Sequence, residues 1–125
     1  MNTFAKILFT FLLGALSSNA FAVTNPTYAE VKAAIENTLA KVEEAQSALD
    51  NDTDKAVLID LISDARQLQK DIANNALDVK RNRASSVLKK ARSAVKNDDL
   101  VSARSALNDA ANRYKEIQRL YASTH

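Results

Sequence analysis

Cysteine and tryptophan are missing from this 125-residue chain, and glycine and methionine occur only once each, as Gly14 and Met1. Without cysteine there is no disulfide bond, so the fold must be held together by its apolar core. Beyond residue 22 there is neither a glycine-rich phosphate loop nor a thiolate or thioether ligand for a soft metal. We therefore expect no metal site and no cofactor.

Histidine occurs only as His125, the last residue, where we expect the helix to fray. Glu43 and Glu44 are adjacent in the sequence. Neighbouring helical residues point about 100° apart, so these two carboxylates do not share a proton-transfer geometry. No Glu-x-x-His pair of the kind that builds a carboxylate metal site is present. The sequence thus predicts no catalytic residue and no enzyme.

The first 22 residues show the three parts of a secretory signal peptide. Lys6 supplies the positive charge, residues 7–16 form an apolar run, and Ala20-Phe21-Ala22 places small residues at the cleavage site. The apolar run is shorter than the roughly 20 residues that cross a bilayer. We expect cleavage after Ala22, a single mature domain of residues 23–125 without a transmembrane anchor, and a periplasmic or secreted location. An N-terminal apolar helix kept in the fold is the alternative.

Large apolar side chains are scarce in the expected mature domain, where Leu, Ile and Val make up 23 of 103 residues. A fraction that low approaches that of disordered chains, but such chains also carry a high net charge. Here 16 basic residues oppose 15 acidic ones. A thin, alanine-rich helical core is the better interpretation.

Apolar residues recur at alternating steps of three and four along four segments, the pattern of amphipathic helices with a heptad seam. The clearest segment spans residues 100–121, and its seam consists of Leu100, Ala103, Leu107, Ala110, Tyr114, Ile117 and Tyr121. The first segment, residues 27–49, repeats the pattern. It opens with Thr27-Tyr28-Ala29-Glu30, which has the spacing of a capping box.

The two middle segments are less regular. The second is expected to reach about Asn74, and its apolar positions are Leu58, Leu61, Ala65, Leu68 and Ile72, with Val57 and Ile62 widening the apolar stripe. The third begins with two polar turns, and its apolar positions are Leu77, Ala84, Val87, Leu88, Ala91 and Val95. Without glycine, the expected left-handed caps at the turns are Asn51, Asn75 and Asn97. Four helices with short connections predict an all-α, up-down-up-down four-helix bundle.

Charge is divided between the two halves of the mature chain. Residues 23–76 carry 10 acidic and 5 basic residues, whereas residues 77–125 carry 5 acidic and 11 basic ones. The third segment concentrates the basic charge in Lys80, Arg81, Arg83, Lys89, Lys90, Arg92 and Lys96. Either the acidic half complements the basic half internally, or this basic face docks an acidic partner, anionic lipid headgroups or a cell-envelope polyanion. Nucleic acid is disfavoured, because the three tyrosines fall on apolar stripes instead of interleaving with the basic residues.

The last helix also resembles a known family. Residues 96–103 are similar to the polar turn and alanine-rich helix start of the cytochrome b562 family of periplasmic four-helix bundles, and residues 118–121 stand where that family has His-Gln-Lys-Tyr. The resemblance implies the bundle fold. The family binds haem through that His and a Met in its first helix, but this chain has Gln118 there, or Lys115 in an alternative alignment, and no Met in the first helix. Haem binding is therefore not carried over.

These observations predict a small exported, non-catalytic bundle in the cell envelope. It would act by binding an unidentified macromolecular partner through the basic face, or by self-association. The alternative is a cytochrome b562-like carrier of a small ligand or cofactor in the bundle interior.

Overall fold

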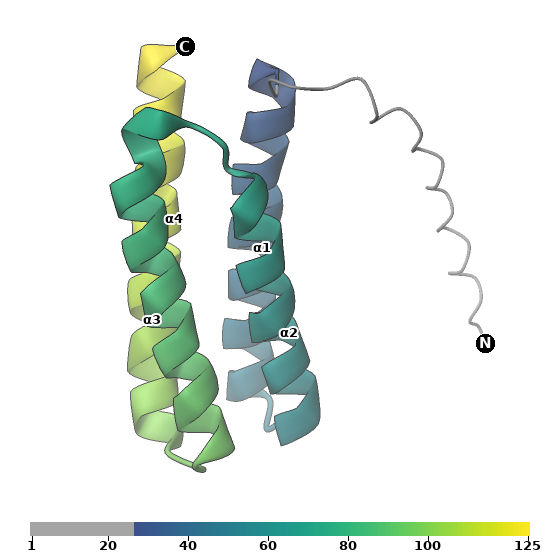
Figure 1. Cartoon of the computed structure of the whole chain (residues 1–125). Helices are drawn as coiled ribbons and strands as arrows, with labels where there is room; N and C mark the ends of the chain where they lie inside the picture. Colours follow the sequence, from purple (N-terminus) through teal and green to yellow (C-terminus); the bar gives the residue numbers. More distant parts are fainter. Residues whose placement is uncertain (1–26) are drawn as a thin grey trace, which may run out of the picture.

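The computed structural model describes residues 27–125, so the expected signal peptide, residues 1–22, lies outside the described residues. Residues 27–125 form four α-helices and no strand (Figure 1). The helices are α1 (Tyr28–Asp50), α2 (Lys55–Leu68), α3 (Asp78–Lys96) and α4 (Leu100–Thr124), and two short 3₁₀ turns, η2 (Gln69–Asp71) and η3 (Asn75–Leu77), connect α2 to α3. The predictions of an all-α chain and of a four-helix bundle are confirmed.

The first helix begins at the predicted capping box. The Glu30 backbone N–H donates to Thr27 Oγ1 at 3.1 Å, and the Thr27 N–H donates to Glu30 Oε1 at 2.8 Å. Each side chain thus satisfies a backbone donor that has no partner within the helix. The start of α1 is therefore fixed by local sequence.

The turns after α1 and α3 have the same backbone hydrogen bonds. Asp52 N–H donates to Leu49 O at 3.3 Å and Thr53 N–H donates to Ala48 O at 3.0 Å, the two bonds of a Schellman motif. Asp98 and Asp99 repeat them at the end of α3. The left-handed residues are Asp52 (φ 55°) and Asp98 (φ 59°).

The expected left-handed caps at Asn51 and Asn97 are thus misplaced by one residue. Both asparagines end their helices with negative φ, at −98° and −93°. Asn75 starts η3 instead, and the preceding Asn74 caps that turn by accepting from Ala76 N–H at 2.9 Å. Aspartate can take the left-handed position because its short polar side chain tolerates that conformation better than most residues do.

Helix α2 ends at Leu68, six residues before the expected end at Asn74. The chain continues through η2, leaves helical geometry at Ile72, and Asn74 is fully extended. Four positions of the predicted stripe are buried, whereas Leu61 and Leu68 are only half-buried and Val57 is exposed. The residues that face the core are Leu58, Ile62, Ala65, Gln69 and Ile72.

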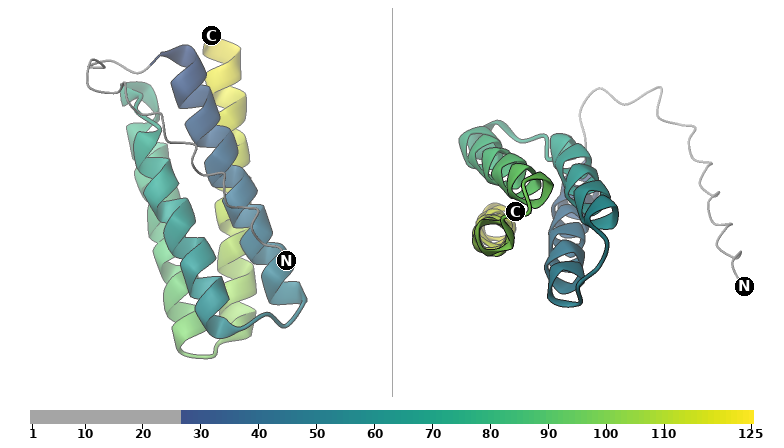
Figure 2. Two further views of the ribbon diagram at one scale, coloured as in Figure 1. Left: turned by 90° about the vertical axis from the view of Figure 1, so that its right-hand side faces the viewer. Right: turned by 90° about the horizontal axis from the view of Figure 1, so that it is seen from below.

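Contacts between helix ends show that α1 and α4 are antiparallel. Tyr28 at the start of α1 stacks on Tyr121 near the end of α4, with ring centroids 5.2 Å apart, and Asp50 at the end of α1 pairs with Arg104 near the start of α4. Figure 1 accordingly places the start of α1 and the end of α4 at the same end of the bundle. Figure 2, seen from below, shows α3 and α4 on one side and α1 and α2 on the other.

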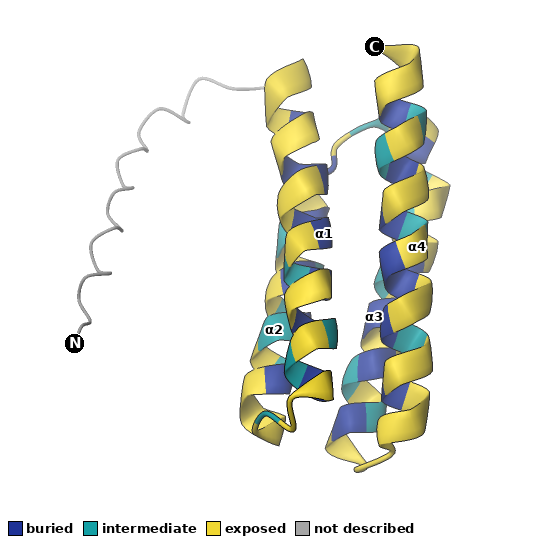
Figure 3. Ribbon diagram, turned by 180° about the vertical axis from the view of Figure 1, so that it is seen from behind, coloured by how far each residue is buried: buried dark blue, intermediate teal, exposed yellow. Residues whose placement is uncertain are grey.

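Buried residues form one continuous core along the inner faces of the helices (Figure 3). Tyr114 is the largest fully buried side chain. Small residues line much of the rest, and those with no exposed surface are Ala45, Ala65, Ala84, Ala91, Ala103 and Ala110. The predicted seam of α4 is buried except at its first position, since Leu100 is 46% exposed.

His125 does not fray as expected. Its ring lies 4.1 Å from the Tyr121 ring and 5.4 Å from the Tyr28 ring, measured between centroids. Its Nδ1 lies 3.0 Å from Tyr121 O. The C-terminal residue is therefore part of an aromatic cluster that covers the end of the bundle.

We expect Asp52→Gly to raise the free energy of unfolding by about 0.5–1 kcal/mol, because glycine adopts positive φ without a Cβ clash. Asp52→Val should lower it, since a β-branched residue is strongly disfavoured at positive φ. Urea denaturation measures both. Asp98→Gly serves as a comparison that should gain less, because it also removes the ion pair with Lys55. A valine variant as stable as the parent would show that this turn does not need the left-handed conformation.

Asp99 caps α4 by accepting from Ser102 N–H at 3.1 Å, and hydrogen bonding to Ser102 lowers the pKa of the Asp99 carboxyl. A carboxyl whose pKa is lower in the folded state stabilises the fold above its unfolded pKa, near 3.8, and loses that contribution as the pH falls through the folded value. We expect Asp99→Ala to lower the melting temperature. The decrease should be largest at pH 7 and should shrink as the pH falls below 3.8. Asp60→Ala, which removes an exposed carboxylate from α2, is the control. If the difference in melting temperature between Asp99→Ala and the parent does not change with pH, the Asp99 carboxylate does not stabilise the start of α4 in this way.

Candidate functional site

The groups considered for chemistry do not converge in the described part of the chain. Glu43 and Glu44 are both exposed and have different partners, Lys115 at 4.0 Å for Glu43 and Lys41 at 3.1 Å for Glu44. Within residues 27–125 no group of three or more His, Cys, Asp or Glu residues could hold a metal ion. The adjacent glutamates are therefore two separate surface charges.

All seven residues of the predicted basic face lie on α3, but they do not form a single stripe. Because a helix turns about 100° per residue, they divide into two sets on either side of the buried stripe of α3. The first, the α4-side set, consists of Lys80, Arg83 and Lys90. The second, the α2-side set, consists of Arg81, Lys89, Arg92 and Lys96.

Contacts identify the neighbour of each set. Lys80 Nζ lies 3.5 Å from Glu116 Oε2 of α4, and Lys90 lines a shallow groove of about 290 Å³ with Ser102 and Asp109 of α4. On the other side, Arg81 NH1 donates to Ile72 O, just beyond α2, at 3.2 Å. The basic charge of α3 therefore borders two different neighbours, the groove beside α4 and the interface with α2.

Most of these bases have no acidic partner among residues 27–125. Lys80 pairs with Glu116, and Arg81 lies 3.6 Å from Asp78. The remaining five have no carboxylate within 4.0 Å in the described part of the chain: Arg83, Lys89, Lys90, Arg92 and Lys96. Their charge is not neutralised by the fold.

The internal complementarity expected between the two halves is present at α4. Arg104 of α4 pairs with Asp50 of α1, and Lys115 of α4 lies 4.0 Å from Glu43 of α1. These pairs join the basic half to the acidic half along one helix interface. Complementarity thus accounts for bases of α4 and leaves those of α3 unexplained.

Three arginine side chains carry a buried Nε atom without a hydrogen-bond partner in residues 27–125. Two are Arg81 and Arg92 of α3, and the third is Arg66 of α2. All three side chains are half-buried. The sequence interpretation missed Arg66 because it belongs to the half with net negative charge. The sequence signal that could have identified Arg66 is its position next to Ala65, which belongs to the predicted apolar seam.

Tyr114 shows that Arg66 and Arg81 approach the same region. Burial raises the pKa of the Tyr114 hydroxyl well above its usual value, and the positive charges of Arg66 and Arg81 partly oppose that rise. The hydroxyl donates to Gln69 Oε1 at 3.5 Å. Two guanidinium groups from different helices therefore lie near one buried, neutral tyrosine.

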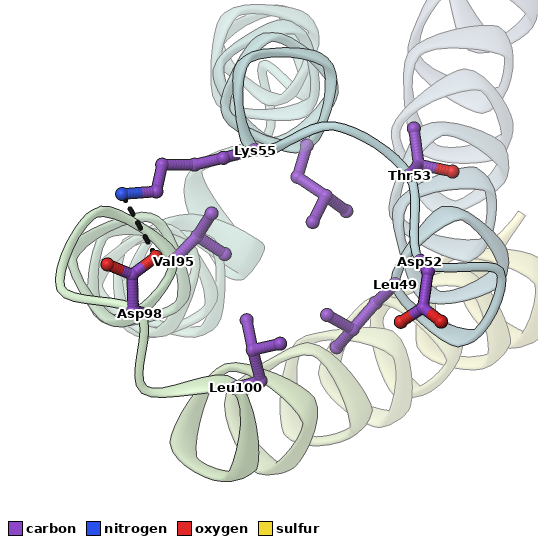
Figure 4. Close-up of a pocket in the computed structure, with 8 residues that line it drawn as sticks. Leu49, Asp52, Thr53, Lys55, Val95, Asp98 and Leu100 are labelled. Carbon is purple, nitrogen blue, oxygen red and sulfur yellow. Dashed lines mark ion pairs between the residues drawn. The ribbon is translucent and has the colours of Figure 1, made fainter.

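A separate recess of about 230 Å³ lies between the α1–α2 turn and the α3–α4 turn. Figure 4 shows Leu49, Val95 and Leu100 around its opening and the ion pair between Lys55 Nζ and Asp98 Oδ1, 3.0 Å long, at its edge. The recess holds no catalytic arrangement of side chains.

The two positions compared with the haem ligand of the cytochrome b562 family lie at the edge of the core. Lys115 is exposed, and Gln118 is half-buried. The neighbouring interior positions, Tyr114 and Ile117, are fully buried apolar contacts. Neither candidate position therefore belongs to the buried core.

Comparison of the chain with protein-family models, curated proteins and solved structures gave no match. Among the helices of residues 27–125, none is both long enough and apolar enough to cross a membrane.

We expect Arg92→Met to raise the free energy of unfolding by about 1 kcal/mol at low ionic strength, because it removes a half-buried charge whose Nε has no partner. Arginine and methionine have similar helix propensities, so the backbone is little affected. Urea denaturation of Arg83→Met, which changes an exposed arginine of the same helix, is the control. If Arg92→Met is no more stable than Arg83→Met, the guanidinium of Arg92 carries no such cost.

Proposed function

We propose that this chain is a small, non-catalytic, exported bundle that binds an acidic macromolecular partner of the cell envelope through the basic residues of α3. The observation that carries this proposal is the set of five α3 bases without an acidic partner in residues 27–125. Export rests on the signal-peptide pattern of residues 1–22 and implies a periplasmic or secreted location.

The framework in this proposal is an up-down-up-down bundle. Its support is the short connections and the contacts between helix ends, which include Tyr28 with Tyr121 and Lys55 with Asp98. Such a bundle holds the α4-side set and the α2-side set of bases at fixed backbone positions on one regular helix. Bases with an ordered backbone lose less conformational entropy on binding than bases on a flexible segment.

Unneutralised charge has three consequences for binding. It raises the rate of encounter with a partner of opposite charge, and it makes the affinity fall as salt is added. It also disfavours partners of the same charge. Salt sensitivity is therefore the property that separates this proposal from binding through apolar contacts.

Self-association is the second candidate function, and exposed apolar residues favour it. Leu100 is 46% exposed and Val101 is 82% exposed, and both lie at the start of α4. Burying them between two copies would add apolar area to a thin core. Light scattering over a range of concentrations separates this candidate from binding by a monomer.

Carriage of a small ligand or cofactor in the bundle interior stays the alternative that the cytochrome b562 resemblance suggests. No contact described above favours it over docking at α3. Titration with haem tests its haem version, and an unshifted Soret band would remove that version.

We expect the triple variant Lys89→Glu, Lys90→Glu and Arg92→Glu to lose salt-sensitive binding to cell-envelope partners while keeping its helical circular dichroism. None of the three has an ion pair in the described structure, so no native pair is broken. Crosslinking followed by pull-down from envelope fractions, at low and high salt, measures the loss.

The matched control is Arg113→Glu, Lys115→Glu and Arg119→Glu on α4, which changes the net charge by the same amount. It should keep the binding. Equal loss in both triples would mean that net charge alone matters. Unfolding of the α3 triple would mean that these bases complement the acidic half of the chain.

A further inference from the structure

Helices α2 and α3 carry matching stripes of residues beside their buried faces. Both stripes advance by four, four, three and four residues, so each follows one side of its helix. The stripe on α2 and η2 is Lys55, Ile59, Ser63, Arg66 and Lys70, and the stripe on α3 is Arg81, Ser85, Lys89, Arg92 and Lys96. Neither stripe contains an acidic residue.

The two stripes face the same seam and run in opposite directions. At one end, Lys55 Nζ donates to Lys96 O at 3.2 Å. At the other end, Arg81 NH1 donates to Ile72 O at 3.2 Å. Between these fixed points, Arg66 comes level with Ser85, and Ile59 comes level with Arg92. At each height along the seam, at least one of the two stripes therefore carries a basic residue.

Among residues 27–125, acidic partners are present only at the two ends of this seam. Asp78 lies 3.6 Å from Arg81, and Asp98 lies 3.0 Å from Lys55. In the middle, Arg66, Lys89 and Arg92 have no carboxylate within 4.0 Å among residues 27–125. The Nε atoms of Arg66 and Arg92 are buried and unpaired in that same part of the chain.

Like charges on both sides of a helix interface, with guanidinium groups partly withdrawn from water, lower the stability of the fold. An anion placed between them would reverse that effect. Arginine suits this purpose because its planar fork can donate two hydrogen bonds to one carboxylate. The seam thus has the composition of an anion-binding groove that is built from two helices.

We propose that the α2–α3 seam binds an extended acidic segment of a partner polypeptide, with its carboxylates on Arg66, Arg92 and the lysines beside them. This inference rests on the proposed function and names the partner's chemistry and its groove. It also adds Arg66 and Lys70, from the acidic half of the chain, to the binding residues.

Spacing favours an extended peptide. Steps of three or four helical residues place successive stripe positions about 4.5–6 Å apart along the axis, and the whole stripe is about 22 Å long. An extended chain presents every second side chain to the same face about 6.6 Å apart. About seven residues with acids at alternate positions would therefore span the seam and place a carboxylate near most of its levels.

Other anionic partners fit the seam less well. A flat lipid surface can reach exposed Lys89 and Lys96, but the Arg81 side chain is only 21% exposed and lies back between the helices. Single-stranded nucleic acid usually stacks its bases on aromatic side chains, and neither stripe contains an aromatic residue. A narrow, extended chain of carboxylates can follow the seam and approach the half-buried Arg66 and Arg92 more closely than a flat membrane can.

The test uses fluorescence anisotropy with purified protein and a labelled peptide of four Glu-Ala repeats. The corresponding Gln-Ala peptide controls for charge, and a peptide with four consecutive Glu followed by four Ala controls for spacing. We expect the alternating acidic peptide to bind at low salt more tightly than the block peptide, and the Gln-Ala peptide not to bind. Equal binding of the alternating and block peptides would overturn the spacing argument.

Variants locate the binding groove. We expect Arg66→Gln with Arg92→Gln to weaken peptide binding at least tenfold, whereas Arg113→Gln with Arg119→Gln, the same change on α4, should leave it within twofold. Arg83→Gln with Lys90→Gln tests the groove next to α4 and should weaken it by threefold or less. Circular dichroism checks folding, and Arg66→Lys, which keeps the charge but loses the fork, should weaken binding severalfold.

The outcomes separate the two proposals. If only the Arg83 and Lys90 pair abolishes binding, the α3 face is correct and the α2–α3 seam is wrong. If no α3 variant affects peptide binding or envelope capture, both proposals fail. If vesicles of anionic phospholipid bind with the same dependence on Arg66 and Arg92 and the peptide does not, the partner is a membrane and the acidic-peptide proposal is overturned.

Discussion

Burial of four apolar stripes against one another is the interaction on which the rest of this structure depends. No disulfide is available, because the chain has no cysteine, and residues 27–125 contain no cluster suited to a metal ion. Stability therefore comes from removing apolar surface from water. Since much of the buried surface belongs to alanine, the helices must approach closely, and Tyr114 supplies the largest side chain in the interior. A core of this kind leaves a small margin for unfavourable interactions elsewhere.

Because the stability margin is small, the arrangement of charged residues affects the stability of the fold. The chain uses ion pairs between α1 and α4, where basic residues lie opposite acidic ones, and places basic residues on both sides of the seam between α2 and α3. Arg66 and Arg92 lose part of their hydration in that seam without gaining a protein partner in the described residues. A binding surface often carries such a cost, because side chains arranged for a partner are not arranged for maximal stability.

The turns show the same compromise on a smaller scale. Asp52 and Asp98 adopt the left-handed conformation that glycine would adopt with less strain. In exchange, Asp98 can pair with Lys55 and hold the end of α3 beside the start of α2. That contact lies at one end of the α2–α3 seam, where Lys55 also donates to Lys96 O.

Local sequence determined where α1 and α4 begin and which faces of the helices are apolar. The capping box at Thr27 and Glu30, the acidic cap at Asp99 and the heptad seam of α4 each depend on residues within a few positions of one another. Periodicity therefore predicted the four helices and most of the core. The positions of Lys and Arg along the sequence likewise predicted that α3 carries the basic charge.

Tertiary structure decided what periodicity could not, since a helical pattern defines a face without naming its neighbour. The end of α2 at Leu68 depends on the crossing to α3, where Arg81 binds the carbonyl of Ile72. The lack of a carboxylate within 4.0 Å of five α3 bases among residues 27–125, and the place of Arg66 beside the α3 bases, depend on which helices lie side by side. These relations join residues far apart in the chain, and only the packing of the four helices decides them.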